Sequence, residues 1–305
     1  CTANIKNEIG KCTYTHMLNE GAGIETDLTV VCLEKNYFRI ISSAAVRTHD
    51  KAHILRHLSK DIEFKDITDD LICLGIFGPK SRELLSKITN ENLSNENFKF
   101  GTAKYIKIGS LNIWAQRLSY VGELGYELYI SNKNAKEIYD LIVETGKSFN
   151  LTHCGAHTMD TMRMESGFLH WAHDISPEEN QYQAGLNFAI SYKKPFDFIG
   201  KQKLLEIKNQ KIDRRFVMLT LKDSTPGKPL LLHEEPIYLD DKIIGKTTSG
   251  NYSFNYNKNL SFGYINSELT NEQLIDKNLF IEIEKIKYKA QLLLKPLKQG
   301  NFKKI

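Results

Sequence analysis

Residues 14–30 read Tyr14-Thr-His-Met-Leu-Asn-Glu-Gly-Ala-Gly-Ile-Glu-Thr-Asp-Leu-Thr-Val30. The pattern predicts two strands joined by a tight turn at Gly21 and Gly23, where the chain needs φ values that other residues avoid. Because side chains alternate along a strand, the apolar residues of the second strand share one face: Ile24, Leu28, Val30 and Cys32. Asp27 falls on the opposite face. It is either a solvated hairpin residue, which the pattern alone favours, or an acid group held in a partly dry pocket, as catalysis requires.

Composition sets the broad class. The chain has 305 residues, of which 41% are hydrophobic and 26% are charged, enough for two or three modules with a sizeable core. Its 41 basic and 37 acidic residues are dispersed and give a net charge of only +4, so no nucleic-acid partner is indicated. No apolar run approaches the roughly 20 residues that span a bilayer, so no membrane association is indicated. Five cysteines without a C-x-x-C pair indicate reduced thiols in a cytosol-like compartment and no zinc site.

A second motif is Tyr120-Val-Gly-Glu-Leu-Gly-Tyr-Glu-Leu-Tyr129. Two glycines flank Glu123 and predict a turn, and the residues from Tyr126 to Ile130 then alternate as a strand. Glu127 therefore faces away from the apolar side chains next to it in the sequence. From the pattern alone, a charged residue on an edge strand and a buried ligand-binding carboxylate remain equal alternatives.

Three helical segments are predicted, and two of them carry clustered charged or histidine side chains. The segment from Thr48 to Leu58, with Thr48 as N-cap, has histidines every four residues, which predicts a solvated helix face and no metal site: His49, His53 and His57. A helix from Asn134 to about Phe149 turns four residues inward: Ile138, Leu141, Ile142 and Thr145. A third helix runs from Gly155 to Gly167, and its charges are expected to pair within the helix: Asp160, Arg163 and Glu165. The following His170-Trp-Ala-His-Asp174 lacks the spacing of a zinc-binding helix.

From Arg214 onward the chain consists of short alternating segments separated by Gly, Asn, Asp and Pro. This pattern predicts an antiparallel barrel or sandwich. Residues Gly245-Lys-Thr-Thr-Ser-Gly250 superficially suggest a phosphate loop, but no helix follows them, so a turn is expected instead.

These motifs together resemble the aminomethyltransferase family, which includes the glycine-cleavage T-protein. The hairpin 14–30 is similar to the family's folate-site hairpin, and residues 120–127 match its Y-x-G-E-x-G-x-E segment. Residues 160–167 and 245–250 resemble the family's D-S-L-R-L-E-x-G and G-x-x-T-S-G. The resemblance implies an α+β folate-binding aminomethyltransferase fold of interleaved subdomains over residues 1–211, followed by a small antiparallel β-barrel over 212–305. The family packs these parts around a central folate channel.

The resemblance also implies a tetrahydrofolate site. Asp27 would lie next to the reacting nitrogen and act as the catalytic group, while Glu127 would hold the pterin ring with Tyr120 against it. Tyr14 and Ile41 would complete the site. The chemistry fits Glu127, because the pterin edge offers two adjacent N–H donors that one carboxylate accepts together. No metal ligand is implied.

Several details favour relatives of the dimethylglycine and sarcosine dehydrogenases within this family, where the E-x-D-L-T-V form of the hairpin occurs. Met159 stands where the T-protein has a folate-binding arginine. The chain opens at Cys1 in a stretch similar to an internal C-A-N-D-V of the family, so we expect the start of the folate domain to be missing.

The expected activity is capture of the methylene group of an oxidised N-methyl amine as 5,10-methylenetetrahydrofolate. FAD would belong only to a missing N-terminal half, a flavin dehydrogenase part joined in cis or in trans, and the small-molecule partner would be the methylated amine or its iminium. A cytoplasmic location is expected, or the mitochondrial matrix in a eukaryote. Three alternatives stay open: a T-protein, a direct folate-dependent demethylase, and a non-catalytic folate-binding module.

Overall fold

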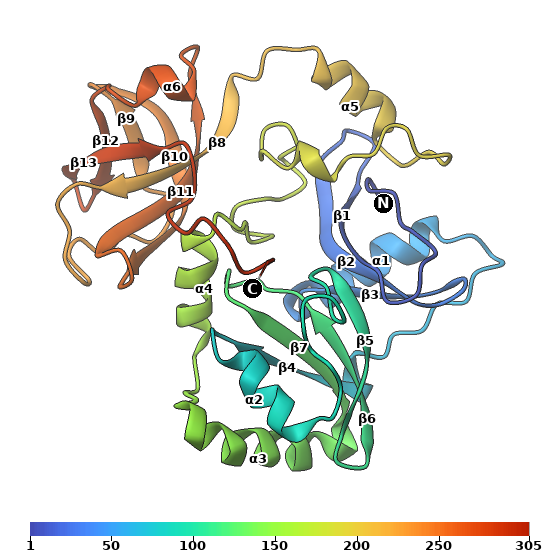
Figure 1. The fold of residues 1–305 in the computed structure, drawn as a ribbon. Coiled ribbons are helices and arrows are strands. Elements are labelled where there is room, and N and C mark those ends of the chain that lie inside the picture. The colour runs from blue at the N-terminus through green and yellow to red at the C-terminus, as the bar shows by residue number, and fades with distance from the viewer. Residues whose placement is uncertain (305) are drawn as a thin grey trace.

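The first part of the molecule is a three-stranded antiparallel sheet with one helix. The computed structural model describes residues 1–304. The predicted hairpin is confirmed as β1 (Cys12–Leu18) and β2 (Ile24–Glu34), and β3 (Tyr37–Ser42) pairs with β2 on its other edge. In this register the Cα atom of His16 lies opposite that of Asp27. Helix α1 (Arg47–His57) follows, reached through the 3₁₀ turn Ala44–Val46 (Figure 1).

The second part is a four-stranded antiparallel sheet with two helices on one face. Its strand order is β4-β7-β6-β5, and the bounds are Leu71–Phe77, Gly125–Ser131, Leu111–Arg117 and Thr102–Ile108 in that order. Helices α2 (Ser81–Ile88) and α3 (Ala135–Gly146) enclose a core that includes Tyr126 and Leu128. Since Glu127 lies between these two core residues, the alternation of the strand directs it to the other face of the sheet.

The third part is a closed six-stranded antiparallel barrel. Its strand order is β10-β11-β8-β13-β12-β9, closed by pairing of β9 with β10. The bounds are β8 Arg214–Leu221, β9 Pro236–Leu239, β10 Lys242–Ser253, β11 Lys258–Asn266, β12 Leu279–Ile283 and β13 Ile286–Leu293, with the short helix α6 (Asn271–Leu274). The predicted barrel-type pattern is confirmed. Short 3₁₀ turns elsewhere in the molecule are Thr68–Asp70, Asn132–Asn134, Lys147–Phe149 and Asn187–Ala189.

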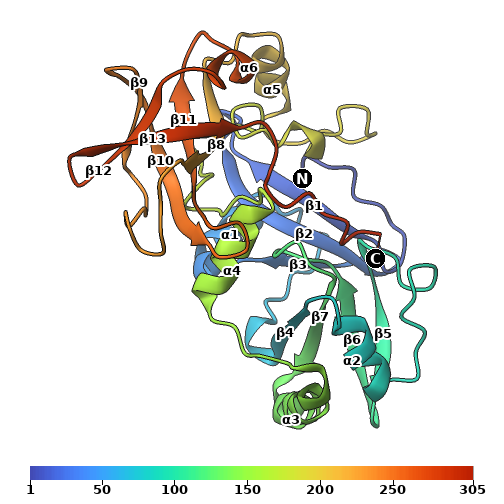
Figure 2. The same ribbon diagram turned by 60° about the vertical axis from the view of Figure 1, so that its left-hand side comes forward.

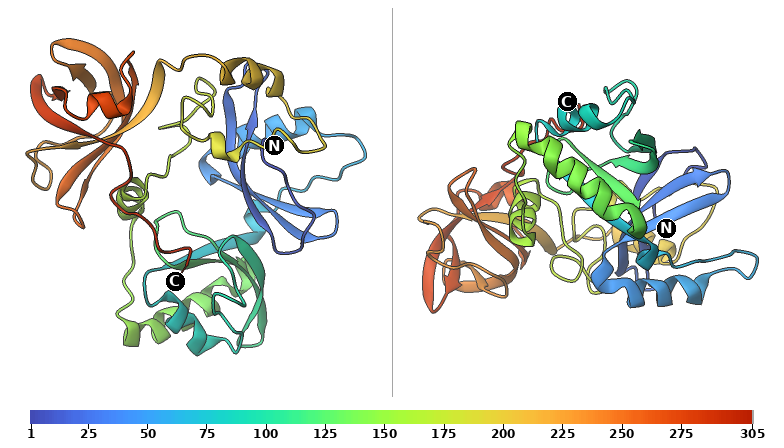
Figure 3. Two further views of the ribbon diagram at one scale, coloured as in Figure 1. Left: turned by 45° about the horizontal axis from the view of Figure 1, so that its top comes forward. Right: turned by 90° about the horizontal axis from the view of Figure 1, so that it is seen from below.

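Helices α4 (Ala156–Glu165) and α5 (Lys201–Lys208) connect these parts. Figure 1 and Figure 2 show α4 beside the barrel, where it contacts β10 and β11. The C-terminal segment leaves the barrel and returns toward the second part, where the backbone N–H of Lys298 donates to Glu165 O over 2.8 Å. Figure 3 shows the three parts arranged around a common centre. No helix within residues 1–304 is long and apolar enough to cross a bilayer.

Five local predictions were wrong. Gly21 and Gly23 do not take the φ values predicted for them: the positive φ of the hairpin turn is at Ala22, +70°, and Gly23 is needed because a Cβ there would lie 1.9 Å from Pro177 O. His53 is 6% exposed and packs beside His57, so the histidine stripe is not a fully solvated face. Thr48 is not the N-cap of α1, which begins after Val46 without a side-chain cap. Leu141 is 37% exposed, because α3 covers only one face of the sheet and the inward stripe is narrower than expected. Residues 245–250 form no turn: they lie within β10, where a bulge between Thr247 and Ser249 absorbs the irregular register.

Candidate functional site

A central cavity of about 2830 Å³ lies between the three parts of the molecule. It is several times larger than an ordinary small-molecule pocket of about 300–1,000 Å³. All five predicted site residues line its wall: Tyr14, Asp27, Ile41, Tyr120 and Glu127. Three come from the first sheet, and two come from the second sheet and the loop before β7. The fold therefore brings residues more than 100 positions apart to one cavity.

The hairpin places Asp27 on the cavity side of β2. The other face of the strand carries Ile24 and Leu28, both buried, so the alternation leaves Asp27 facing the cavity. The surrounding protein removes most bulk water, and this burial raises the pKa of the Asp27 carboxyl group to about 7. A hydrogen bond with Tyr14 opposes this rise, while the negative charge of Asp50 adds to it. Asp27 therefore changes its protonation state near neutral pH.

Glu127 lies on β7, opposite Gln116 of β6 and Gly75 of β4. Its Oε2 accepts a hydrogen bond of 2.9 Å from the Tyr129 hydroxyl. Burial raises the pKa of the Glu127 carboxyl group, and the bond from Tyr129 lowers it by a smaller amount. A Cβ at Gly75 would lie 2.4 Å from the Phe77 ring, so the glycine makes room for that ring on this face of the sheet.

Tyr120 is fixed by the segment that follows α4. Its hydroxyl donates to Leu169 O over 3.0 Å, and its ring stacks on Phe168 with the centroids 6.3 Å apart. The turn between Tyr120 and β7 requires Gly122, whose φ is +66° and whose missing Cβ would meet Ser166 Oγ at 2.0 Å. Ile41 contributes an apolar wall from β3, opposite Thr29 of β2.

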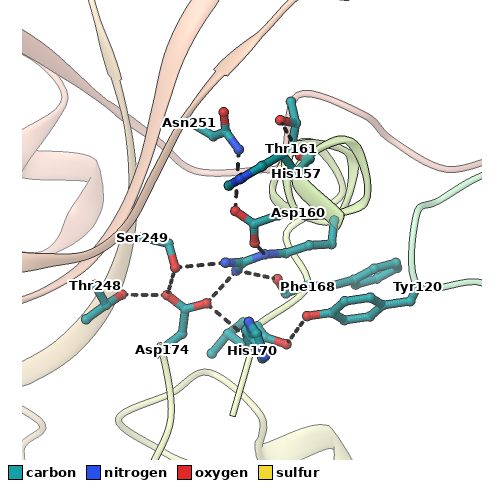
Figure 4. A network of polar contacts seen from close by, with 12 residues as sticks. Tyr120, His157, Asp160, Thr161, Phe168, His170, Asp174, Thr248, Ser249 and Asn251 are labelled. Atoms are coloured by element: carbon teal, nitrogen blue, oxygen red, sulfur yellow. Dashed lines mark hydrogen bonds and ion pairs between the residues drawn. The ribbon is translucent and has the colours of Figure 1, made fainter. Parts of the chain in front are cut away.

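A buried charge network joins α4, the following loop and the barrel (Figure 4). Arg163 is 1% exposed and pairs with Asp174, which is equally buried. The Asp174 carboxylate also accepts hydrogen bonds from the hydroxyls of Thr248 and Ser249, over 2.6 and 2.8 Å. The predicted pairing within the helix is present between Arg163 and Asp160 at 2.8 Å.

That intrahelical interpretation was nevertheless incomplete. Arg163 and Glu165 mainly reach outside α4, because the barrel strand β10 presents hydroxyl groups to them. Glu165 accepts from the Ser253 hydroxyl over 2.6 Å and from the Asn255 amide over 2.9 Å. The two side chains therefore fasten the helix to the barrel.

The segment 170–174 does not assemble a metal centre. His170 and His173 stack on each other with ring centroids 4.6 Å apart, and Asp174 is engaged with Arg163. Residues 1–304 contain no group of three or more His, Cys, Asp or Glu side chains placed to hold a metal ion. All five cysteines have free thiols.

Arg39 is a cavity residue that the sequence analysis missed. Its guanidinium group lies 5.8 Å from the ring centroids of both Trp114 and Tyr129. Its Nε and Nη1 atoms are buried and make no hydrogen bond within residues 1–304. Unsatisfied buried donors are costly, so they indicate that an acceptor atom of a ligand belongs here. The available sequence signal was a single basic residue among the apolar residues of 37–41.

Both parts of the chain match models of known protein families. Residues 1–194 match the model of the GCVT N-terminal domain, and residues 214–298 match that of the glycine cleavage T-protein C-terminal barrel domain. The chain belongs to the glycine cleavage T-protein family of aminomethyltransferases. The predicted family and fold are thereby confirmed.

Three relatives illustrate the family. The chain is 34% identical over 300 residues to dimethylglycine dehydrogenase, mitochondrial, of Homo sapiens, covering 97% of this chain and 34% of that protein. It thus spans about one third of that relative. It is 31% identical to the aminomethyltransferase of Alkaliphilus metalliredigens, covering 98% of this chain and 78% of that protein. The crystal structure of aminomethyltransferase T from Bartonella henselae matches with a TM-score of 0.81 at 20% identity, covering 96% of this chain and 77% of that one.

Membership of this family implies tetrahydrofolate binding, and the polar groups of the cavity fit that ligand. A pterin ring presents both N–H donors and acceptor atoms along its edge. The cavity offers a carboxylate at Glu127 and buried donors without protein partners at Arg39. Its volume also exceeds what the ring alone needs, which leaves space for a second reactant.

Proposed function

We propose that this chain transfers a one-carbon unit from an oxidised N-methyl amine of the dimethylglycine or sarcosine type to tetrahydrofolate. The product would be 5,10-methylenetetrahydrofolate together with the demethylated amine. The observation that carries this proposal is the position of Asp27: a carboxyl group with a pKa near 7 faces a cavity wide enough for two reactants. A general base works best when its pKa lies near the working pH.

In this proposal the walls of the cavity orient the folate. Glu127 would accept the two adjacent N–H donors of the pterin edge, Arg39 would donate to an acceptor on the same ring, and Tyr120 and Ile41 would pack against its faces. When bound, tetrahydrofolate supplies the nitrogen nucleophiles that accept the carbon. Holding both reactants next to each other in one cavity would also favour transfer over hydrolysis of the iminium to formaldehyde.

Asp27 would then stabilise the cationic reactant and transfer the proton. Its carboxylate stabilises the positive charge of the iminium and takes up the proton lost by the attacking nitrogen when the new C–N bond forms. It returns that proton to the amine nitrogen as the original C–N bond breaks. When the second C–N bond of the product closes, the carboxylate would take up the proton of the second folate nitrogen and release it to solvent, which regenerates it. The Tyr14 hydroxyl, which hydrogen-bonds to Asp27, would keep the carboxylate directed at the reacting atoms.

The source of the iminium would be a flavin-dependent dehydrogenase, in cis or in trans. The similarity to dimethylglycine dehydrogenase along 97% of this chain supports this partner. Met159, which lines the cavity and is 45% exposed, supports the same choice over glycine cleavage, where an arginine is expected at that position. A transferase of the T-protein type remains the second candidate because of the similarity to an aminomethyltransferase along 98% of the chain.

The test compares Asp27→Asn with the unmodified protein in the presence of the amine-oxidising partner. The substitution keeps the shape of the side chain but removes its charge and its capacity as a base. At saturating tetrahydrofolate, we expect methylenetetrahydrofolate formation to fall by about 100-fold or more, the usual scale for a positioned acid–base group, while formaldehyde takes its place. Tetrahydrofolate should still bind, as calorimetry would measure. An unchanged ratio of formaldehyde to folate product would refute this function for Asp27.

A further inference from the structure

A relay of polar side chains, Gln181, His16 and Tyr14, leads to Asp27: Gln181 and His16 are fully buried, and Tyr14, which is 37% exposed, lies at the cavity surface. His16 lies opposite Asp27 in the β1–β2 register and is fully buried. Its Nε2 is 3.0 Å from the Tyr14 hydroxyl, and its Nδ1 is 2.8 Å from the Gln181 side-chain amide nitrogen. Tyr14 and Asp27 project from the same face of the β1–β2 hairpin, where Tyr14 lies opposite Thr29, two residues beyond Asp27, and hydrogen bonding by the Tyr14 hydroxyl lowers the pKa of the Asp27 carboxyl group. The family comparison assigns no role to His16 or Gln181.

The direction of these hydrogen bonds follows from the contact between Gln181 and Thr2, at the end of the relay most distant from Asp27. The Thr2 hydroxyl donates its single proton to Ala189 O over 3.0 Å. Its oxygen must therefore accept from Gln181, which lies 3.1 Å away and so presents its NH₂ group on this side. The same NH₂ group supplies the second proton to His16 Nδ1, which is consequently an acceptor.

The protonation state of His16 fixes the next step. Burial lowers the pKa of His16 to about 3, so its imidazole is neutral and carries one proton. Because Nδ1 accepts from Gln181, that proton resides on Nε2 and is donated to the Tyr14 oxygen. Burial and the charge of Asp27 raise the pKa of Tyr14 well above its usual range, so the hydroxyl keeps its own proton and donates it to Asp27.

We propose that His16 and Gln181 are positioning residues that orient the Tyr14 hydroxyl as a hydrogen-bond donor to Asp27. With its oxygen accepting from His16 Nε2–H, the hydroxyl directs its own proton away from His16 and toward the carboxylate. The relay thereby stabilises the ionised form of a carboxylate that burial would otherwise keep protonated. This inference concerns what sets the pKa of the Asp27 carboxyl group. It rests on the proposed function only where that carboxylate acts as a base.

Other ionisable groups around Asp27 set the background. Asp50 from α1 opposes its ionisation, and the Tyr120 hydroxyl from the second part is electrostatically coupled to it. Neither contacts His16 or Gln181 by a hydrogen bond that the structure gives within residues 1–304. Substitution of the relay therefore leaves these charges in place.

The experiment measures the ionisation of Asp27 directly, without folate or amine. In protein carrying ¹³C-labelled aspartate, the side-chain carboxyl resonance that disappears in Asp27→Asn is followed by NMR as a function of pH. Tyr14→Phe removes the donor, and we expect it to move the midpoint upward by about one pH unit, the scale of a hydrogen bond to a charged group. His16→Asn, which is too short to reach Tyr14, should move it in the same direction.

Two matched variants separate this role from ordinary packing. A glutamine at 16 places an amide N–H where Nε2 lies, so His16→Gln should keep the midpoint near that of the unmodified protein. Adding His16→Asn to Tyr14→Phe should produce no further shift, since the relay acts only through the hydroxyl. If His16→Asn does not fold, Gln181→Met replaces it, and the expected shift has the same sign.

An unshifted midpoint in both His16→Asn and Gln181→Met, beside a shifted one in Tyr14→Phe, would overturn the relay. Equal shifts in His16→Asn and His16→Gln would do the same, because loss of the ring alone would then explain them. These outcomes do not depend on transfer activity. Failure of the proposed function would appear instead in the product ratio of Asp27→Asn.

Discussion

Asp174→Asn is expected to loosen the attachment of the barrel. Arg163 and Asp174 are both almost fully buried, and the carboxylate accepts from two barrel hydroxyls and from the backbone N–H of His170. Asparagine preserves the volume but removes the charge that compensates the Arg163 guanidinium. Removing one partner of a buried ion pair typically costs about 3–5 kcal/mol. Since Asp160 remains within 2.8 Å of Arg163, we expect the lower end, about 3 kcal/mol.

Asp160→Asn is the matched control, because it removes a carboxylate from the same guanidinium. The Asp160 side chain is 34% exposed, so water shares in its stabilisation and the expected loss is about 1 kcal/mol or less. Replacing Arg163 by Met and Asp174 by Leu together should be less harmful than Asp174→Asn alone, since no uncompensated charge is left buried.

Urea unfolding followed by the fluorescence of Trp171 provides the assay. Trp171 lies three residues before Asp174 and donates from Nε1 to Ile24 O over 3.0 Å, so it reports on this region. A Trp114→Phe background removes the other tryptophan. Equal losses of unfolding free energy for Asp174→Asn and Asp160→Asn would show that the network is not a buried ion pair in solution.

Two further predictions concern the cavity wall and the hairpin turn. Glu127→Gln places an N–H donor opposite a pterin N–H and should cost on the order of 2–3 kcal/mol of tetrahydrofolate binding free energy, measured by calorimetry. Tyr129→Phe keeps the carboxylate and should cost less. An unchanged dissociation constant for Glu127→Gln would argue against that contact. Gly23→Ala should lower the midpoint of thermal unfolding, because its Cβ would lie 1.9 Å from Pro177 O. At Gly21 the nearest atom to an added Cβ is 3.3 Å away, so Gly21→Ala should be nearly neutral. Similar unfolding midpoints for the two variants would contradict this.

The local parts of the fold could be predicted from the sequence because their signals are periodic. Alternation in β2 and β7 fixes which side Asp27 and Glu127 take, and Gly122 takes the positive φ of the turn before β7, whereas in the hairpin turn that role falls to Ala22. The barrel follows from short alternating segments with frequent turn residues. The irregularity at 245–250 was misread because a bulge within a strand and a turn between strands use the same residues.

The polar contacts across long separations could not be predicted in this way. His16 meets Gln181 across 165 positions and Arg163 meets Ser249 across 86, and no periodicity relates such residues. The sequence also gave a reason to treat Arg163 as paired with Asp160, because spacings of three residues suit helical pairs. The loop after α4 and the barrel, brought against α4 by the fold, supply the other partners: Asp174 and Ser249.

Three other contacts between distant parts of the sequence meet in one short segment, residues 169–174. Its Leu169 carbonyl holds the Tyr120 hydroxyl, its Trp171 indole holds the hairpin at Ile24, and its Asp174 holds the barrel. The segment therefore connects all three parts that surround the cavity. A change in the barrel network has a physical route to the cavity wall through the four residues between Leu169 and Asp174 and the hydroxyl of Tyr120. We therefore expect Asp174→Asn to weaken tetrahydrofolate binding although Asp174 itself is engaged with Arg163 and the barrel, whereas Asp160→Asn should leave that affinity unchanged.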